Sequence, residues 1–163
     1  MPRSFIVAPL PAEHVGRAFP VVQPLRPAMT LAQWHAIAAP FLQATLPSEP
    51  ERGILACRMG TGHIRGLFCY ALHETGELRI GPFAVAGLFD TRATAEGLIE
   101  AIDQLALRLG AARIVVDANA CSAASVRLCN IPAMFLEHGY RKDGDTLVRN
   151  AVDVEPMASG STA

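Results

Sequence analysis

The sequence predicts one α/β domain, an α+β arrangement in which a central mixed sheet is covered by helices on both faces. Three observations predict it: the 163 residues fit one compact domain, 51% of them are hydrophobic, and the apolar period changes along the chain between helical and alternating. The formal net charge of −1 excludes a general field that would attract nucleic acid or an anionic membrane. We assign residues 1–154 to the domain and residues 155–163, which are small and polar, to a flexible tail.

The first forty residues predict a strand and two helices. A short apolar run bounded by prolines, residues 5–8, is typical of a strand. Residues 12–22 allow a short helix that Pro20 must end or kink, because proline lacks the amide donor that a helix interior needs. Thr30 and Gln33 then have the spacing of a capping box. The helix that they open has apolar residues three and four positions apart: Leu31, Trp34, Ile37, Ala38 and Phe41.

The apolar period then becomes that of strands. Residues 54–59, 62–72 and 77–89 predict a three-stranded meander with glycine turns between the strands. Both faces of these strands carry apolar side chains, which indicates a sheet that is covered on each side. Gly81-Pro82 interrupts the third strand. Because proline removes a hydrogen bond of the ladder, we expect a bulge or an unpaired segment there.

The second half of the chain predicts helix, strand, helix and strand. The most regular helical period begins after a cap at Asp90 or Thr91. Residues 114–116 follow as a short apolar strand of the kind found in parallel, doubly covered positions, so this part of the chain forms a right-handed crossover. A last helix near residues 132–138 and a strand at residues 146–152 complete the order.

Three segments in this order of elements resemble the GNAT superfamily of acyl-CoA N-acyltransferases. Residues 18–27, followed by Thr30-Leu31, look like the amino-terminal signature of one bacterial subgroup. The Arg-Ala-Thr-Ala-Glu-Gly sequence of residues 92–97 stands where the family has Q/R-x-x-G-x-G/A, and residues 136–140 are similar to its closing helix, glycine and aromatic residue. The resemblance implies a bacterial transferase with acetyl-CoA (CoA) as cosubstrate and a small-molecule or peptide amine as acceptor.

The resemblance also implies where acyl-CoA would lie. The last strand of the meander and the crossover strand would diverge at their carboxyl ends, and the pantetheine arm would fill the gap. Backbone amides of Leu88 and Phe89 would hold it and polarise the thioester carbonyl. The pyrophosphate would meet the free amides at the start of the next helix. The remaining residues assigned to the cosubstrate are Arg92, Ala93, Ala95, Gly97 and Asn119.

The candidates for proton transfer are His63, Asp117 and Tyr140. His63 pairs close to the end of the third meander strand, where it would act as a general base or be an ordinary hairpin histidine. Asp117 and Asn119 follow the crossover strand, where they would orient an amine or only end the strand. Many family members have a tyrosine donor where this chain has Phe135. Protonation of the departing thiolate would then fall to solvent or to Tyr140, whose other interpretation is a packing aromatic.

Two functions stay open from the sequence. The first is an N-acyltransferase in which a primary amine attacks acyl-CoA directly in a ternary complex. The second is a catalytically inactive GNAT-fold module that binds CoA or a protein partner. The extra methyl group of Ala95, the negative charge of Glu96 and the phenyl ring of Phe135 favour this second interpretation. The acceptor and the acyl chain length are open, and such folds often pair as homodimers.

Several other classes of site are excluded. The four cysteines form no C-x-x-C pair and His73 has no second ligand at helical spacing, so we expect no metal. The single lysine, Lys142, has no P-loop glycines before it. Cys121 has no histidine fixed beside it by the sequence, so a buried or loop thiol is the simpler interpretation. Without a signal peptide, an apolar span or aromatic-interleaved arginines, we expect a cytoplasmic protein that binds neither membranes nor nucleic acid.

Overall fold

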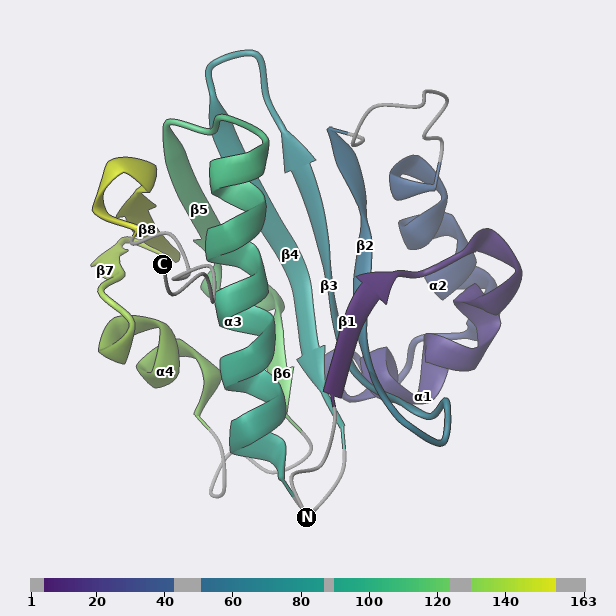
Figure 1. Cartoon of the computed structure of the whole chain (residues 1–163). Coiled ribbons are helices and arrows are strands. Elements are labelled where there is room, and N and C mark those ends of the chain that lie inside the picture. The colour runs from purple at the N-terminus through teal and green to yellow at the C-terminus, as the bar shows by residue number, and fades with distance from the viewer. Residues whose placement is uncertain (1–4, 43–50, 87–89, 124–129, 155–163) are drawn as a thin grey trace, which may run out of the picture.

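The computed structural model describes residues 5–42, 51–86, 90–123 and 130–154. Its eight strands form one mixed sheet in the order β1-β2-β3-β4-β5-β8-β7, with β6 beside β4 (Figure 1). The strands are β1 (Phe5–Pro9), β2 (Arg52–Met59), β3 (Ile64–Leu72), β4 (Glu77–Val85), β5 (Arg113–Asp117), β6 (Cys121–Ala123), β7 (Arg141–Asp143) and β8 (Thr146–Asn150). The α-helices are α1 (Phe19–Val22), α2 (Leu31–Ala38), α3 (Thr91–Arg108) and α4 (Ile131–Glu137). The 3-10 helices are η1 (Ala12–Ala18), η2 (Gln23–Leu25), η3 (Ala39–Phe41), η4 (Ala118–Ala120) and η5 (Ala151–Asp153).

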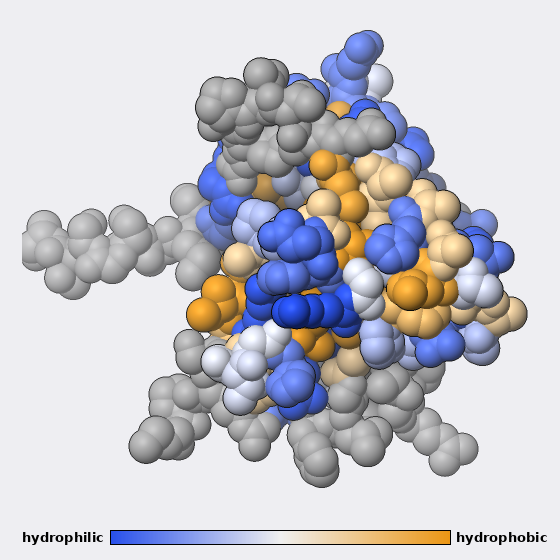
Figure 2. Space-filling model, turned by 90° about the vertical axis from the view of Figure 1, so that its right-hand side faces the viewer, coloured by the Kyte–Doolittle hydropathy of each residue, from blue (hydrophilic) through white to orange (hydrophobic). Residues whose placement is uncertain are grey.

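The sheet separates two hydrophobic cores, as the two apolar faces of the strands predict. On β3, Phe68 and Tyr70 pack into the core under α3 and α4, whereas Leu67 and Cys69 pack into the core under α1 and α2. The side of the molecule on which α1 and α2 lie, at the right of Figure 1, presents hydrophilic side chains at its centre with apolar areas on both sides of them (Figure 2). Within the described residues, no helix combines the length and apolar character that crossing a membrane requires.

The first helices differ in detail from their prediction. Pro20 does not end a helix at 12–22; it lies in the first turn of α1, where its missing amide hydrogen costs nothing. Thr30 and Gln33 do form the capping box, with Gln33 N–H donating to Thr30 Oγ1 at 3.2 Å and Thr30 N–H to Gln33 Oε1 at 2.8 Å. Trp34 is fully buried, but Leu31 is 46% exposed, so the apolar face of α2 is narrower than its period indicates.

The predicted bulge in the third meander strand is present. Phe68 pairs with Phe83 and Tyr70 pairs with Ile80, so Gly81-Pro82 is inserted opposite a single residue of β3. The insertion reverses the alternation of β4, because Ile80 and Phe83 then face the same core. The other partner of β4 also changes here, since β5 pairs only as far as Ile80.

The expected gap between the carboxyl ends of β4 and β5 does not extend to those ends. After β5, the single turn η4 returns the chain to the sheet, and β6 pairs in parallel with β4 at Phe83–Val85. The strands therefore separate only around Gly81-Pro82. β4 and β5 do part after Ile80 and Val116, but the sequence did not predict β6 beside the end of β4, because a strand of three residues has no periodicity that marks it as a strand. The short hairpin strand β7 was missed for the same reason, and β8 ends at Asn150, before the predicted residue 152.

A buried polar network joins α3 to the last hairpin. Asp103 is 7% exposed, and its carboxylate accepts hydrogen bonds from the Tyr140 hydroxyl at 2.9 Å and from Arg149 Nη1 at 3.1 Å. Burial raises the pKa of Asp103, while the Tyr140 hydroxyl and the Arg149 charge oppose that rise. The Tyr140 hydroxyl and the Arg149 guanidinium thus supply hydrogen bonds to both oxygens of the buried Asp103 carboxylate.

Removing the Tyr140 hydroxyl should therefore destabilise the fold. We expect Tyr140→Phe to lower the free energy of unfolding by about 1–3 kcal/mol, because it leaves a buried carboxylate oxygen without its donor. Urea denaturation of the wild type, Tyr140→Phe, Asp103→Asn and the double variant measures the coupling. Additive effects of the two substitutions would contradict the hydrogen bond.

Candidate active site

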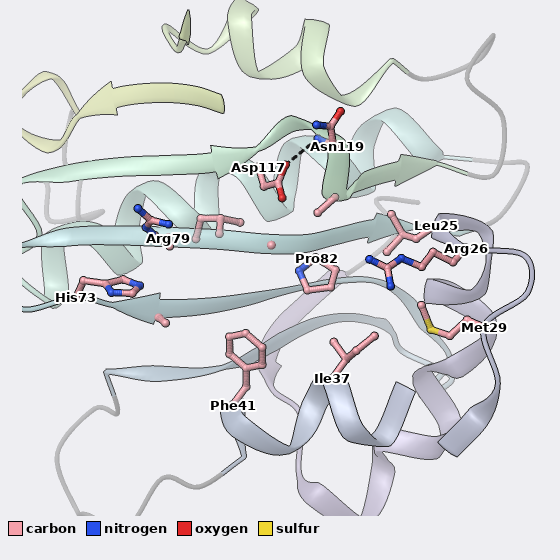
Figure 3. Close-up of a pocket in the computed structure, with 14 residues that line it drawn as sticks. Leu25, Arg26, Met29, Ile37, Phe41, His73, Arg79, Pro82, Asp117 and Asn119 are labelled. Carbon is pink, nitrogen blue, oxygen red and sulfur yellow. Dashed lines mark hydrogen bonds between the residues drawn. The ribbon is translucent and has the colours of Figure 1, made fainter. Parts of the chain in front are cut away.

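A cavity of about 550 Å³ lies between α2 and the sheet, over the break in β4 (Figure 3). Its floor is the bulge and the neighbouring part of β3, and its apolar wall comes from the segment between η2 and η3. The lining residues are Leu25, Arg26, Met29, Ile37, Phe41, Ala71, His73, Arg79, Ile80, Gly81, Pro82, Asp117, Asn119 and Ala120.

The bulge places the end of β5 directly beside this floor. A Cβ atom added at Gly81 would lie 3.5 Å from the Cβ atoms of both Asp117 and Ala120, which is ordinary van der Waals contact. Proline at position 82 offers no amide hydrogen to a neighbouring strand, so the ladder cannot close at this point. The break in pairing is therefore lined by backbone and by the first side chains after β5.

Asp117 and Asn119 both line the cavity, at the end of the sheet where their positions after the crossover strand predict them. The Asp117 carboxylate accepts the Asn119 amide hydrogen at 3.0 Å and so caps η4 (Figure 3). Both residues are exposed, so the rest of the carboxylate can receive another donor. A carboxylate held in this way can bind an ammonium group and accept a proton from it.

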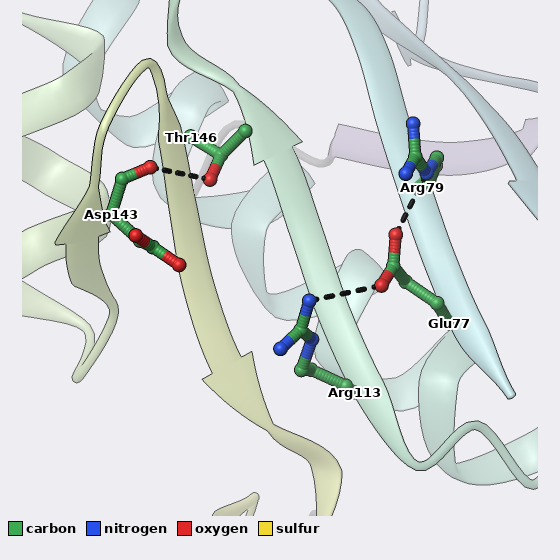
Figure 4. Close-up of polar contacts among 5 residues, drawn as sticks. All are labelled: Glu77, Arg79, Arg113, Asp143 and Thr146. Atoms are coloured by element: carbon green, nitrogen blue, oxygen red, sulfur yellow. Dashed lines mark hydrogen bonds and ion pairs between the residues drawn. The ribbon is translucent and has the colours of Figure 1, made fainter. Parts of the chain in front are cut away.

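Basic side chains on the rim were missed by the sequence predictions. His73 and Arg79 come from the two sides of the turn between β3 and β4, and Arg26 follows η2. Arg79 Nε donates to Glu77 Oε1 at 2.7 Å, and Arg113 Nη2 donates to Glu77 Oε2 at 3.0 Å (Figure 4). The two arginines hold the pKa of Glu77 below its usual value against the opposing effect of desolvation, which is the largest single influence on it. The predicted turn at 74–76 is the signal that could have placed His73 near Arg79.

Of the residues expected to bind a pyrophosphate, Arg92 and Ala93 are exposed at the start of α3, whereas Ala95 is buried. Arg92 and Ala93 are exposed in the first turn of α3, but Arg92 Nη2 donates to Glu137 at 2.6 Å and Arg92 Nε lies 3.3 Å from Glu96. Ala95 is fully buried in the core under α3, so its assignment to the ligand is corrected. Its position on the helix directs the methyl group toward the sheet. Gly97 has open space where a Cβ would lie.

The other predicted residues lie away from the cavity or outside the described chain. His63 is exposed in the turn between β2 and β3 and is absent from the cavity lining. Tyr140 is 3% exposed, and its hydroxyl is engaged with Asp103, as a packing aromatic would be. Phe135 is fully buried between Phe83 and Tyr140, with ring centroids 5.2 and 4.9 Å away. Leu88 and Phe89 lie outside the described residues.

Cys121 is not suited to nucleophilic chemistry. Burial, together with the nearby charge of Asp117, raises the pKa of its thiol to about 12, so the thiolate is scarce at neutral pH. Its Sγ lies 3.4 Å from the Asp117 carbonyl oxygen, where it helps to hold the connection between β5 and β6. Among the described residues, no group of three His, Cys, Asp or Glu side chains is placed to hold a metal ion.

The fold has close relatives among solved structures, although the sequence does not. No protein-family model and no curated protein matches the sequence. A GNAT-family acetyltransferase from Staphylococcus aureus Mu50 is 7% identical, with a TM-score of 0.68 over 91% of this chain and 99% of its own. Spermidine N-acetyltransferase from Vibrio cholerae, solved with CoA and spermine, is 8% identical, with a TM-score of 0.68 over 92% and 97%.

A third structure, a GCN5-related N-acetyltransferase from Kribbella flavida, is 14% identical with a TM-score of 0.65 over 90% of this chain and 97% of its own. The three likenesses extend over nearly the whole of each chain, so they include the sheet, the crossover and the closing hairpin together. They confirm the architecture that the sequence motifs predict. The chain therefore has the fold of the GNAT acetyltransferases.

Proposed function

We propose that the protein is an acyl-CoA-dependent N-acyltransferase that acylates a primary amine bound in the cavity between α2 and the sheet. The observation that carries the proposal is the position of Asp117, which lies on the cavity wall beside the break in β4. The likeness to GNAT acetyltransferases supports acyl transfer as the chemistry. An acetyl group is the simplest acyl group for such an enzyme to transfer.

In this reaction the amine nitrogen attacks the thioester carbonyl carbon, a C–N bond forms and the C–S bond breaks. The Asp117 carboxylate attracts the amine, orients it and accepts the proton that it must lose, while CoA leaves as a thiolate and takes a proton from solvent. Asn119 fixes the carboxylate through its backbone amide. Neither Tyr140, which is engaged with Asp103, nor the phenyl ring of Phe135 is needed as a proton donor.

The start of α3 is the place for the CoA phosphates in this proposal. An α-helix of 18 residues has a partial positive charge at its first turn, and Arg92 is 57% exposed there. The fit is incomplete because Glu96 and Glu137 already neutralise Arg92. Phosphate binding would have to draw the guanidinium away from these two carboxylates, each of which is itself about half exposed.

The pantetheine arm presents a second requirement. Entry between β4 and the crossover strand requires the three β4–β6 pairs at Phe83–Val85 to open. At about 0.5–1.5 kcal/mol for each hydrogen bond, opening a few of them costs roughly 1–4 kcal/mol. That cost weakens the apparent affinity by about fivefold to several hundredfold, since 1.4 kcal/mol corresponds to a factor of ten.

These same contacts favour a second function, a GNAT-fold module without turnover. The β4–β6 pairs occupy the space that the pantetheine arm would enter, Glu96 and Glu137 pair with Arg92, and the buried phenyl ring of Phe135 has no proton for a departing thiolate. Such a protein would bind CoA, or a protein partner, and release no product. Binding and turnover measured together distinguish the two functions.

Acetyl-CoA binding should depend on Arg92. We expect Arg92→Gln to weaken binding of acetyl-CoA about tenfold, because a charge-assisted phosphate contact is lost. Isothermal titration calorimetry measures this, with Arg17→Gln as the control because Arg17 is an exposed arginine of η1, among the helices that pack on the other face of the sheet. Equal affinity of the wild type and Arg92→Gln for acetyl-CoA would show that the CoA phosphates do not bind at the start of α3. No binding by the wild type would exclude both a transferase and a CoA-binding module.

Binding should also expose β6. We expect amide hydrogen exchange at Cys121–Ala123 to become faster in the presence of saturating acetyl-CoA, while exchange in β2 stays constant. Mass spectrometry of the peptides from the free and bound protein provides the measurement. Stronger protection of Cys121–Ala123 on binding would show that the arm lies elsewhere.

Turnover should depend on the charge of Asp117. We expect Asp117→Asn to lower kcat by about 10²–10⁴-fold, the usual contribution of a general base, with little change in acetyl-CoA affinity. Asparagine keeps the side-chain oxygen that caps η4, so the local fold is preserved. Release of free CoA thiol over an amine panel gives the rate, and Asp153→Asn is the control because Asp153 is exposed on η5. Full activity of Asp117→Asn would remove this residue from the mechanism.

A further inference from the structure

The cavity carries more positive than negative charge. Its lining includes two arginines, Arg26 and Arg79, and His73, but a single carboxylate, Asp117. The Glu77 carboxylate forms ion pairs with both Arg79 and Arg113, so its single negative charge does not neutralise both arginines. A cavity with this balance attracts a ligand that brings an anionic group of its own.

Arg26 is the basic group best placed to receive that anionic group. Its backbone is fixed on both sides, because Arg26 N–H donates to the Gln23 carbonyl at 3.0 Å and the Arg26 carbonyl accepts from Met29 N–H at 2.8 Å. Its side chain extends from the end of η2 toward Pro82 (Figure 3). Within the described residues, no carboxylate forms an ion pair with Arg26, so its five N–H donors face the cavity and solvent.

The remaining wall of the cavity is apolar. Leu25, Met29, Ile37 and Phe41 line it, and Ile37 and Phe41 extend from α2 and η3 toward the sheet (Figure 3). Met29 is buried, and the other three are half-buried. A ligand with an apolar portion would cover these side chains and remove their surface from water.

We propose that the acceptor is an amine that also carries a carboxylate and an apolar portion. The amine would lie at Asp117, the carboxylate at Arg26, and the apolar portion against Ile37 and Phe41. This inference rests on the proposed function and names its substrate class. It separates this chain from the spermidine N-acetyltransferase of Vibrio cholerae, which was solved with spermine, because a ligand with several positive charges would meet two arginines here.

Matched amines test the proposal. Aminohexanoate, hexylamine and diaminohexane share one chain and differ only in the far group, which is anionic, absent or cationic. A phenyl substituent on the same chain, present both in the amino acid and in its partner without the carboxylate, gives a second pair with a larger apolar portion. We expect kcat/KM, measured by thiol release from acetyl-CoA, to be at least about tenfold higher for each carboxylate-bearing amine than for its partner without one, because a charge-assisted hydrogen bond contributes about that factor.

Removing the positive charge of Arg26 should abolish the preference for carboxylate-bearing amines. In Arg26→Gln we expect KM for the carboxylate-bearing amines to rise about tenfold, with kcat nearly unchanged and hexylamine unaffected. Arg17→Gln, an exposed arginine outside the cavity lining, should behave as the wild type does. Equal or faster turnover of hexylamine or diaminohexane by the wild type would overturn the proposal, as would a carboxylate preference that survives in Arg26→Gln.

Binding without acetyl-CoA separates this proposal from the proposed function. Nuclear magnetic resonance titration of the protein with the same amines should give tighter binding of aminohexanoate and its phenyl-substituted form, and Arg26→Gln should weaken it. If this binding pattern is observed but no amine causes release of CoA thiol, the proposed acylation is contradicted and the carboxylate site at Arg26 is supported. If thiol release occurs but neither binding nor kcat/KM depends on the carboxylate, acylation stands and the assignment of Arg26 is wrong.

Discussion

Proline at position 82 prevents β4 from continuing as a regular strand, because it has no amide hydrogen to donate to either neighbour. The extra residue of the bulge reverses the alternation of side chains, so Ile80 and Phe83 enter the same core, and pairing with β5 stops at Ile80. Asp117, the last residue of β5, follows the Ile80–Val116 pair and lies within contact distance of the bulge, and the chain then turns through η4. The cavity, its carboxylate and the position of β6 all depend on this one interruption.

The interruption lies between two sides of the sheet that have different chemistry. On one side, the first turn of α3 and Arg92 offer positive charge to an anion, although Glu96 and Glu137 offset it. On the other side, the cavity under α2 combines apolar side chains with arginines on its rim and a single carboxylate, Asp117, on its wall. A reaction between two ligands would bring one to each side, and they could meet only where the ladder is open.

The two proposed functions, a transferase and a binding module, differ in whether the pairs between β4 and β6 must open. Its three pairs satisfy backbone groups that a ligand between the strands would otherwise use. A ligand that displaces them must provide replacement hydrogen bonds and offset the ordering of its own flexible arm. The pairs are few and β6 follows a 3-10 turn, so the strand is among the least costly parts of the sheet to open. Whether a ligand can enter between the strands therefore depends on residues 118–123, which form η4 and β6.

Much of the fold follows from the sequence because it depends on local chemistry. The capping box at Thr30, the turns at 60–62 and 74–76 and the bulge at Gly81-Pro82 each need only a few adjacent residues, and the period of α3 identifies a long amphipathic helix. The position of Asp117 and Asn119 at the carboxyl end of the crossover strand also follows from the sequence, since residues at the end of a parallel strand lie at a known edge of the sheet. Only the tertiary structure decided that Arg26 and Arg79 share a cavity with Asp117 and that β6 rejoins β4. These features depend on contacts between residues far apart in the chain, and no local pattern encodes which distant side chains meet.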